Sequence, residues 1–114
     1  MASYLDATGA TFDKHTSLYT ISTAQYKNLK SLFFETGGTS FELTRNAQII
    51  PRILNTANGG STNRIYLAIG DLGNIPGLDF ICGMAFLQRF YSVFDTTNQL
   101  IGLAETPYTY ADTN

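Results

Sequence analysis

The sequence predicts a mostly β protein with a few short helices, and three observations support that prediction. Fifteen of the 114 residues are Thr and 13% are aromatic, so residues that favour strands are abundant. Ten Gly and eight Asn supply residues that form tight turns. Several short runs alternate between apolar and polar residues, as half-buried strands do. We therefore expect a single domain, residues 1–114, built from short strands joined by turns.

The first elements are indicated by capping residues and by alternation. Residues 2–7 predict a short helix that ends at Gly9, because glycine adopts the left-handed conformation that commonly closes a helix. Residues 17–21 alternate and predict a strand. Ser22 or Thr23 then caps a short helical turn, since a hydroxyl oxygen accepts a hydrogen bond at a helix N-terminus.

A Gly-Gly pair at residues 37–38 lies between two alternating runs, residues 32–35 and 40–44. Both glycines adopt positive φ without steric cost, so this pattern predicts a β-hairpin. Residues 46–50 are expected to form one helical turn. It ends before Pro51, because the residue that precedes a proline is biased toward extended conformations.

The second half of the chain is expected to contain four further strands and one short helix. The predicted segments are an exposed turn at 58–61, a strand at 64–69, a loop at 70–77, a fully apolar strand at 80–82, a helix at 84–89, and a second hairpin with strands at 90–94 and 100–104. The polar tail that begins at Pro107 is expected to fray.

Charge and composition exclude several classes of function. The chain carries 7 basic against 9 acidic residues and no run of Lys or Arg, so we expect neither nucleic acid nor a membrane surface as a partner. Its apolar runs are far shorter than the roughly 20 residues that span a bilayer. One Cys and one His cannot form a disulfide within the chain or a Cys-rich zinc site, so we expect no metal and no cofactor.

The single Cys and the single His are the candidates for nucleophilic catalysis. Cys82 lies in an apolar run, where a small buried thiol is the usual finding, and His15 lies beside Lys14 among polar residues. We expect Cys82 to be buried and His15 to be exposed in a loop. That separation leaves no nucleophile with an adjacent base.

Aromatic residues raise two further alternatives. Five aromatic residues are expected to pack in the core, along a seam between sheet and helix, rather than to form a ligand pocket, because aromatic side chains dominate protein cores. Its members are Phe80, Phe86, Phe90, Tyr91 and Phe94. Tyr108 and Tyr110, with the many Asn and Thr residues, suit contacts to sugars, so a carbohydrate-binding module is kept as a lower alternative.

Residues 80–104, FICGMAFLQRFYSVFDTTNQLIGLA, resemble the closing segment of the C-terminal lobe of pepsin-like aspartic proteases. In that family two aliphatic residues and a glycine are followed by a short helix, an aromatic strand ending in Phe-Asp, a turn and a final Gly-containing strand. Residues 17–51 resemble the preceding strand, hairpin and short helix of the same lobe. The similarity is to the polyporopepsin type of basidiomycete fungi. It implies a partial acid-protease C-terminal lobe.

The catalytic carboxylate of such a lobe has no counterpart in this sequence. The family carries it in an Asp-Thr/Ser-Gly-Thr motif, which would lie upstream of Met1. A register that aligns Asp13 with this motif fails, because the spacing from Asp13 to residues 81–83 is too short. Lys14 and His15 would also replace the small residues beside the carboxylate. We therefore assign no catalytic residue and interpret the six Asp residues as turn, cap or surface groups.

Two main functional hypotheses follow. The first is a non-catalytic fungal protein that acts by binding a peptide, protein or glycan, with a role in defence or immunomodulation. The second is a C-terminal fragment or chain of a secreted aspartic endopeptidase, hydrolytic only with the missing N-terminal lobe. The resemblance places Ile81 near the floor of a remnant cleft. It also implies an extracellular location, whereas the absence of a signal peptide from these residues leaves a cytoplasmic one open.

An incomplete lobe has a physical consequence for association. The two lobes of the family share a central sheet, so a lobe without its partner has an apolar face and open strand edges. We expect a homodimer that forms through this exposed lobe interface, with edge strands in contact.

Overall fold

The computed structural model describes residues 1–112, and within them seven short strands form three small antiparallel sheets. Short α-helices and 3₁₀ helices separate the strands. The predicted mostly β fold is confirmed.

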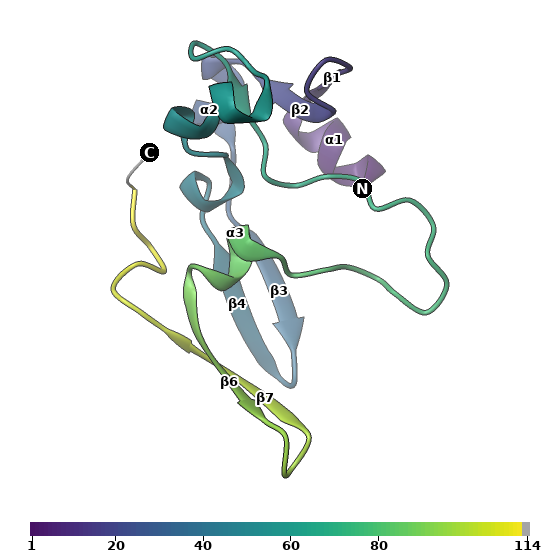
Figure 1. Ribbon diagram of the computed structural model, residues 1–114, viewed down its shortest axis with the longest axis vertical. Coiled ribbons are helices and arrows are strands. Elements are labelled where there is room, and N and C mark those ends of the chain that lie inside the picture. The colour runs from purple at the N-terminus through teal and green to yellow at the C-terminus, as the bar shows by residue number, and fades with distance from the viewer. Residues whose placement is uncertain (113–114) are drawn as a thin grey trace.

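A three-stranded antiparallel sheet and two helices form the body of the molecule (Figure 1). Strands β1 (Thr11–Asp13), β2 (Leu18–Ile21) and β5 (Ile65–Tyr66) lie in that order across the sheet. Helix α1 (Ala2–Thr8) precedes β1, and helix α2 (Thr23–Asn28) follows β2.

The caps of both helices match the sequence prediction. Gly9 follows α1 with φ 66° and donates its N–H to the Leu5 carbonyl at 2.8 Å. Ser22 and Gln25 form a capping box at the start of α2, in which each side chain accepts from the other residue's backbone N–H. Gln25 Nε2 also donates to the Gly9 carbonyl at 2.8 Å, so one side chain ties the end of α1 to the start of α2.

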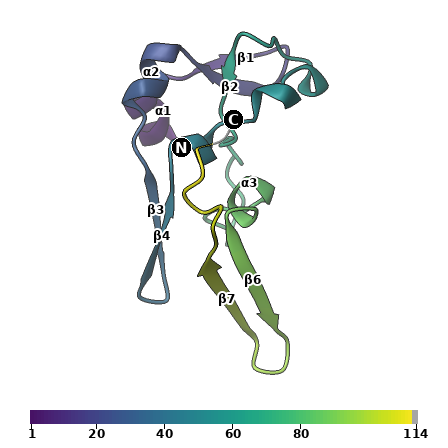
Figure 2. The ribbon, with the colours of Figure 1, turned by 90° about the vertical axis from the view of Figure 1, so that its left-hand side faces the viewer.

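Two β-hairpins extend from the body in the same direction (Figure 2). The first joins β3 (Leu32–Thr36) to β4 (Thr39–Leu43) through the Gly-Gly pair, whose φ values of 57° and 75° fit a type I′ turn. The second joins β6 (Phe90–Asp95) to β7 (Leu100–Glu105). Both predicted hairpins are confirmed.

Very short helices connect the remaining strands. The 3₁₀ helices η1 (Asn46–Gln48), η2 (Arg52–Leu54) and η3 (Thr56–Asn58) lie between β4 and β5, and helix α3 (Met84–Leu87) precedes β6. The elements η1 and α3 confirm the two helical turns predicted for these regions. The sequence did not indicate β1, η2 or η3, because a three-residue element is too short to produce a periodic pattern.

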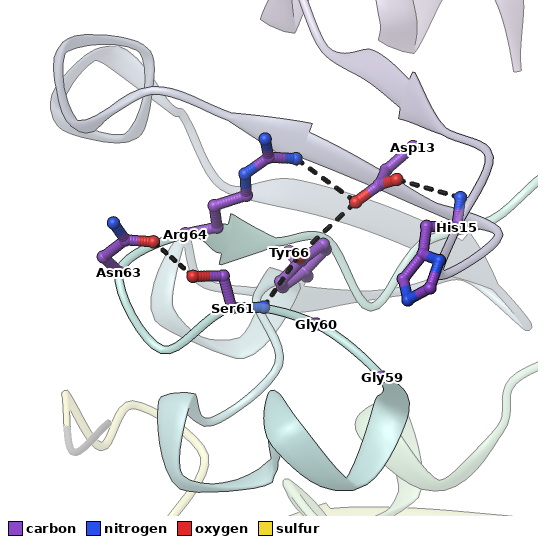
Figure 3. A pocket seen from close by; sticks show the side chains of 8 residues that line it. All are labelled: Asp13, His15, Gly59, Gly60, Ser61, Asn63, Arg64 and Tyr66. Carbon is purple, nitrogen blue, oxygen red and sulfur yellow. Dashed lines mark hydrogen bonds and ion pairs between the residues drawn. The ribbon is translucent and has the colours of Figure 1, made fainter.

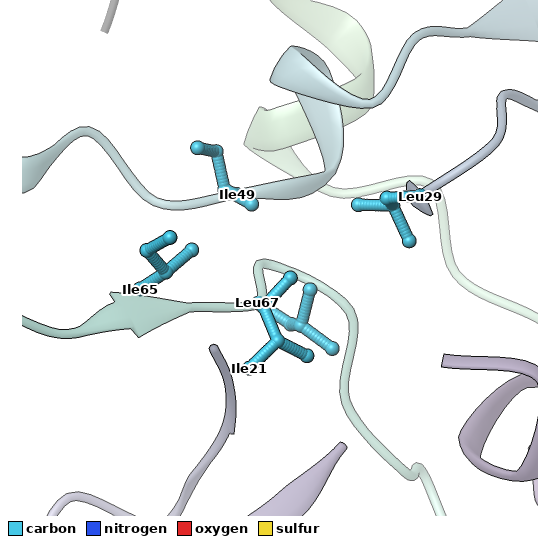
Figure 4. Packing of buried hydrophobic residues seen from close by; sticks show 5 residues of the cluster. All are labelled: Ile21, Leu29, Ile49, Ile65 and Leu67. Atoms are coloured by element: carbon cyan, nitrogen blue, oxygen red, sulfur yellow. The ribbon is translucent and has the colours of Figure 1, made fainter. Parts of the chain in front are cut away.

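The core is divided between two small clusters. The first packs residues from the body sheet against the end of α2 and the segment after η1 (Figure 4), and its members are Ile21, Leu29, Ile49, Ile65 and Leu67. The second joins β4, η1, α3 and β6, and its members are Leu43, Ala47, Phe86 and Phe90. The second cluster therefore attaches the bases of both hairpins to the body.

Two strand predictions fail in this region of the chain. Of residues 64–69 only Ile65–Tyr66 form a strand, with an isolated bridge between Leu67 and Ile49. Residues 80–82 form no strand, and Ile81 is 62% exposed. An apolar run becomes a strand only where a neighbouring strand pairs with it, and the part of the chain that the structure describes offers none here.

Residues 107–112 of the predicted frayed tail are held by specific contacts, contrary to that prediction, and the rest of the tail lies outside the described residues. Thr109 is completely buried, and its hydroxyl donates to the Arg89 carbonyl at 2.5 Å. Arg89 Nη1 in turn donates to the carbonyls of Tyr108 and Ala111 at 3.2 and 2.7 Å. These long-range contacts fix a segment whose composition indicated fraying.

The molecule is more extended than its size predicts. Its radius of gyration is 15.1 Å, whereas about 13 Å is typical of a compact domain of this length. Its accessible surface is 7915 Å², against about 6,200 Å² for a compact monomer of this mass. The excess, roughly 1,700 Å², reflects the two projecting hairpins and the open segment between β5 and α3 (Figure 1).

Candidate functional site

Ile81, the residue predicted to line a remnant cleft, lies in the open segment between β5 and α3. Its side chain is 62% exposed, and that of the adjacent Phe80 is 53% exposed. The Cys82 side chain, in contrast, packs against the second core cluster. The structure thus places Ile81 on an open apolar surface, and its role in a cleft stays a prediction.

Apolar side chains are exposed on both faces of the β6–β7 hairpin. The strand register places Tyr91 and Val93 on one face, opposite Ala104 and Gly102, and places Phe94 on the other face. Tyr91 and Phe94 are 65% and 63% exposed. The predicted core seam is therefore correct for Phe86 and Phe90, which are buried, and wrong for Tyr91, Phe94 and the half-exposed Phe80. Tyr91 lies on the face of β6 opposite to that of the buried Phe90, and Phe94 lies near the tip of the hairpin, beyond the second core cluster.

A polar cavity of about 540 Å³ opens between the β1–β2 turn and residues 59–64 (Figure 3). The Asp13 side chain forms hydrogen bonds with residues on both sides of this cavity. One carboxylate oxygen, Oδ2, accepts from Arg64 Nη1 at 3.3 Å and from the Tyr66 hydroxyl at 3.4 Å. The other oxygen accepts from the His15 backbone N–H at 3.0 Å. The cavity thus holds a carboxylate that three neighbours already bind.

These contacts lower the pKa of the Asp13 carboxyl. The hydrogen bond from the His15 backbone is the largest cause, and the Arg64 charge adds to it. The lowered pKa shows that these contacts favour the ionised carboxylate. Asp13 therefore joins the β1–β2 turn to residues 64–66.

The rim of this cavity is held rigidly. Asn55 is completely buried, and its Nδ2 donates to the carbonyls of Ser61 and Arg64, both at 2.9 Å. The Ser61 N–H donates to the Tyr66 hydroxyl at 3.2 Å. Gly60 packs so closely that a Cβ there would lie 2.6 Å from the Tyr66 ring. Only glycine fits at this position without a shift of the loop.

Other aspartates occupy the turn positions that the sequence predicted. Asp95 accepts from the Asn98 backbone and side-chain N–H groups, and these bonds lower the pKa of its carboxyl. Asp71 accepts from the Gly73 N–H at 2.9 Å. Both carboxylates stabilise tight turns at the surface.

A second buried polar network surrounds Arg89, which is 8% exposed. Its Nη2 donates to Asn46 Oδ1 at 2.9 Å, in addition to the two tail carbonyls already described. Burial lowers the pKa of the guanidinium, and the charge of Asp112 opposes that shift. A second cavity, of about 320 Å³, lies beside this network and is lined by residues that include Arg45 and Tyr110.

Cys82 and His15 lie at separate sites. Cys82 is partly buried, less than the full burial that we predicted, and burial raises the pKa of its thiol. His15 is exposed at the polar cavity, as predicted. Among residues 1–112 no group of three or more His, Cys, Asp or Glu side chains is placed to hold a metal ion. No helix in the described part of the chain is long and apolar enough to cross a membrane.

Comparison with known proteins bears on the identity of the chain. Residues 1–106 match the family described as eukaryotic aspartyl protease. The chain is 59% identical to polyporopepsin from Irpex lacteus over 99% of its own length, which is 34% of that enzyme. The crystal structure of the aspartic proteinase from Irpex lacteus superposes with a TM-score of 0.94, again over 99% of this chain and 34% of that one. The chain belongs to the eukaryotic aspartyl protease family.

A more distant relative supports the same assignment. Aspartic protease 3 of Caenorhabditis elegans is 33% identical over 75% of this chain and 21% of its own length. The predicted resemblance to pepsin-like aspartic proteases of the polyporopepsin type is thereby confirmed. This aspartyl protease chain spans about a third of the length of its polyporopepsin relative.

Two polar networks of this aspartyl protease chain were not predicted from the sequence. The ion pair between Asp13 and Arg64 joins residues 51 positions apart, and the bond between Arg89 and Asn46 joins residues 43 apart. Neither pair produces a local pattern of charge or hydropathy. The one signal that could have indicated the second is an Arg inside an otherwise apolar stretch, since a buried cation requires polar partners.

Proposed function

We propose that this chain forms the C-terminal part of the second lobe of a secreted aspartic endopeptidase. In this proposal it takes part in peptide hydrolysis only together with the polypeptide that carries the two Asp-Thr/Ser-Gly motifs. The observation that carries the proposal is the excess accessible surface, roughly 1,700 Å² more than a self-sufficient monomer of this mass exposes. An excess of that size is comparable to the surface that obligate partners bury.

The chemistry of the excess surface supports the proposal. Large apolar side chains are exposed on the β6–β7 hairpin and along the segment before α3, including Ile101 at 69% and Ile81 at 62%. Monomeric soluble proteins rarely leave contiguous apolar patches of several hundred Å² uncovered. The close similarity to one third of a polyporopepsin-type enzyme supports the proposal that the remaining polypeptide of such an enzyme covers them.

The reaction itself requires groups from outside this chain. Aspartic proteolysis uses two carboxylates that share one proton, and together they activate a water molecule and polarise the scissile carbonyl. None of the six Asp residues lies in an Asp-Thr/Ser-Gly motif. Asp13, Asp71 and Asp95 are bound in the structural contacts described above. The proposed contribution of the chain is to support the second catalytic loop and to place Ile81 at the cleft.

A chimera tests this proposal. The chain replaces the matching third of Irpex lacteus polyporopepsin, and hydrolysis of an acid-denatured protein is measured for the chimera, the parent enzyme and the isolated chain. We expect the chimera to retain activity within about tenfold of the parent and the isolated chain to have none. A chimera that folds, as judged by circular dichroism, but does not hydrolyse the substrate contradicts the proposal. So does hydrolysis by the isolated chain.

A matched pair of variants in the chimera tests the role of Ile81. Ile81→Asp places a charge at the proposed cleft, whereas Ile53→Asp places the same charge on η2, where the side chain is 86% exposed. We expect the first variant to lower kcat/KM at least tenfold and the second to leave it unchanged. Equal effects would exclude Ile81 from the cleft. In-frame Asp-Thr/Ser-Gly codons upstream of Met1 in the gene would support the endopeptidase, and their absence would favour the non-catalytic binding protein.

A further inference from the structure

We infer that Asn58 is a site of spontaneous deamidation, in which its side-chain amide is lost and the backbone at this position is altered. Asn58 is the one Asn of the sequence that precedes a Gly. It ends η3, and both Asn58 and Gly59 are exposed on the loop that forms one rim of the polar cavity (Figure 3). The inference concerns a chemical modification of the chain and therefore goes beyond the proposed function.

The reaction consumes one water molecule and releases one molecule of ammonia. The Gly59 backbone nitrogen attacks Asn58 Cγ, so an N–Cγ bond forms as the Cγ–Nδ2 bond breaks, and the proton of the attacking nitrogen leaves with the ammonia. Water then opens the resulting five-membered imide at either of its two carbonyls, which gives an Asp or an isoaspartyl residue. The reaction requires no oxidant, reductant or enzyme, since Asn is chemically labile.

The surroundings of Gly59 leave its backbone nitrogen open to this role. Glycine has no side chain that shields the nitrogen. A Cβ built on Gly59 meets nothing within 4 Å, so no other segment of the described chain fills the space beside it. Asn63, the other exposed Asn of this loop, precedes the large Arg64. The attacking nitrogen is therefore less shielded at Asn58 than at Asn63.

Two hydrogen bonds oppose the attack, and both lie at the surface. Asn58 Nδ2 donates to the Leu54 carbonyl at 2.9 Å, and the Gly59 N–H donates to the Thr56 carbonyl at 3.0 Å. Both bonds must break before the nitrogen and Cγ can meet. They belong to a three-residue 3₁₀ helix whose residues are all exposed, and such elements open locally at low cost. The fold therefore slows the reaction without preventing it.

Asn55 provides an internal comparison, because it lies three positions earlier in opposite surroundings. It is completely buried, and its Nδ2 donates to the carbonyls of Ser61 and Arg64. The next residue, Thr56, is β-branched and shields its own nitrogen. Attack at Asn55 requires the loss of two buried hydrogen bonds, so we expect it to be at least about tenfold slower than attack at Asn58.

Conversion of Asn58 should loosen the rim of the polar cavity. A carboxylate at this position has no donor for the Leu54 carbonyl and places a negative charge beside that oxygen. An isoaspartyl residue also adds a carbon to the backbone, close to Gly60, which packs tightly against the Tyr66 ring. Both products therefore act on the segment that holds the cavity closed on this side.

Peptide mapping of the complete polypeptide encoded by the gene tests the inference, so that any covering of the loop is included in the measurement. The folded protein is incubated in neutral buffer and digested with trypsin, with a sample taken before incubation as the reference. Residues 53–64 leave as one peptide, because Arg52 precedes it and Arg64 ends it. Mass spectrometry then locates each conversion of an amide to an acid among Asn55, Asn58 and Asn63.

We expect Asn58 to convert at least about tenfold faster than either of the other two residues. Equal rates at the three positions overturn the inference. So does an Asn58 amide that persists while the protein stays folded. Asn58→Gln keeps an exposed amide but requires a larger ring for the same attack, so it should abolish conversion at this position.

A matched pair of variants tests the effect on the rim. Asn58→Asp reproduces one product and should lower the Tm of the complete polypeptide. Asn63→Asp makes the same change of charge, but Asn63 Oδ1 accepts from Ser61 Oγ at 2.5 Å, and a carboxylate can still accept there. It should leave the Tm unchanged, and equal Tm values for the two variants overturn the effect on the rim. None of these readouts depends on proteolysis by this protein, so they are independent of the chimera.

Discussion

The Arg89 guanidinium donates to Asn46 Oδ1 at 2.9 Å, and both residues are buried although 43 positions separate them. The same guanidinium holds the Tyr108 and Ala111 carbonyls, while the Arg89 carbonyl accepts from the buried Thr109 hydroxyl. One residue at the start of β6 therefore ties η1 to the C-terminal tail. It fixes the base of the β6–β7 hairpin, on which Tyr91, Val93, Phe94, Leu100 and Ile101 are exposed.

Replacing Arg89 should destabilise the fold strongly. Arg89→Met removes the donors of one buried acceptor, Asn46 Oδ1, and of two partly buried carbonyls, and a buried unsatisfied polar group costs about 1–3 kcal/mol. We expect the free energy of unfolding to fall by about 2–4 kcal/mol in a urea titration. Arg45→Met is the control, because that guanidinium is exposed and lies over the Tyr26 ring at 5.5 Å. Arg45→Met should lower the free energy of unfolding by about 1 kcal/mol or less. Similar losses for the two variants would show that the Arg89 hydrogen bonds do not stabilise the fold.

Alkaline pH should weaken the attachment of α1. Burial raises the pKa of Tyr4 to about 12, and its hydroxyl donates to Gln48 Oε1 at 3.0 Å. Because the pKa is higher in the folded state than the unfolded value of 10.0, this stability is present below pH 10 and is lost as pH rises toward 12. In urea titrations of the wild type, the free energy of unfolding should therefore fall as pH rises from 10 toward 12.

The Tyr4→Phe variant isolates that contribution. It should be less stable than wild type at neutral pH, by about 1 kcal/mol, because Gln48 Oε1 loses its donor. The difference between the two proteins should shrink between pH 10 and pH 12. A constant difference across that range would show that Tyr4 does not titrate with the fold.

Acid pH should remove the contribution of the Asp13 carboxylate. Its pKa is lowered in the folded state, so the stability that it adds is present above its ordinary value of 3.8 and is lost as pH falls through the folded pKa. Asp13→Asn should therefore lower the Tm near neutral pH, and the difference should vanish in strong acid. Asp71→Asn is the control near neutral pH, because its carboxylate accepts a hydrogen bond from the Gly73 N–H in a surface turn, and it should lower the Tm less than Asp13→Asn does. A pH-independent effect of Asp13→Asn would argue against the ion pair.

The polar cavity should depend on a glycine at position 60. A Cβ on Gly60 would lie 2.6 Å from the Tyr66 ring, whose atoms are buried and cannot move aside freely. Gly60→Ala should lower the free energy of unfolding by about 1–3 kcal/mol, because it overpacks a site that is already filled. Gly70→Ala meets nothing within 4 Å and should be neutral or slightly stabilising, since it reduces the freedom of the unfolded chain. Equal melting temperatures for the two variants would contradict this reading of the loop.

Local sequence determined the elements that need no distant partner. The Gly-Gly turn set the first hairpin, the Ser22–Gln25 capping box set the start of α2, and the polar turn at residues 95–99 between two apolar runs set the second hairpin. Each of these depends on groups a few residues apart, so the physical cause lies within a single window of sequence. The family resemblance also rested on such windows, and it was confirmed.

Tertiary structure alone decided which apolar residues are buried and which polar residues meet. Phe90 and Tyr91 are neighbours in sequence, yet the first is 6% and the second 65% exposed, because only one face of the hairpin meets the body. The apolar run at residues 80–82 forms no strand for lack of a partner among the described residues, and residues 107–112 are held through Arg89. Burial and pairing depend on what lies across space, and no local pattern encodes contacts between residues 40 or more positions apart.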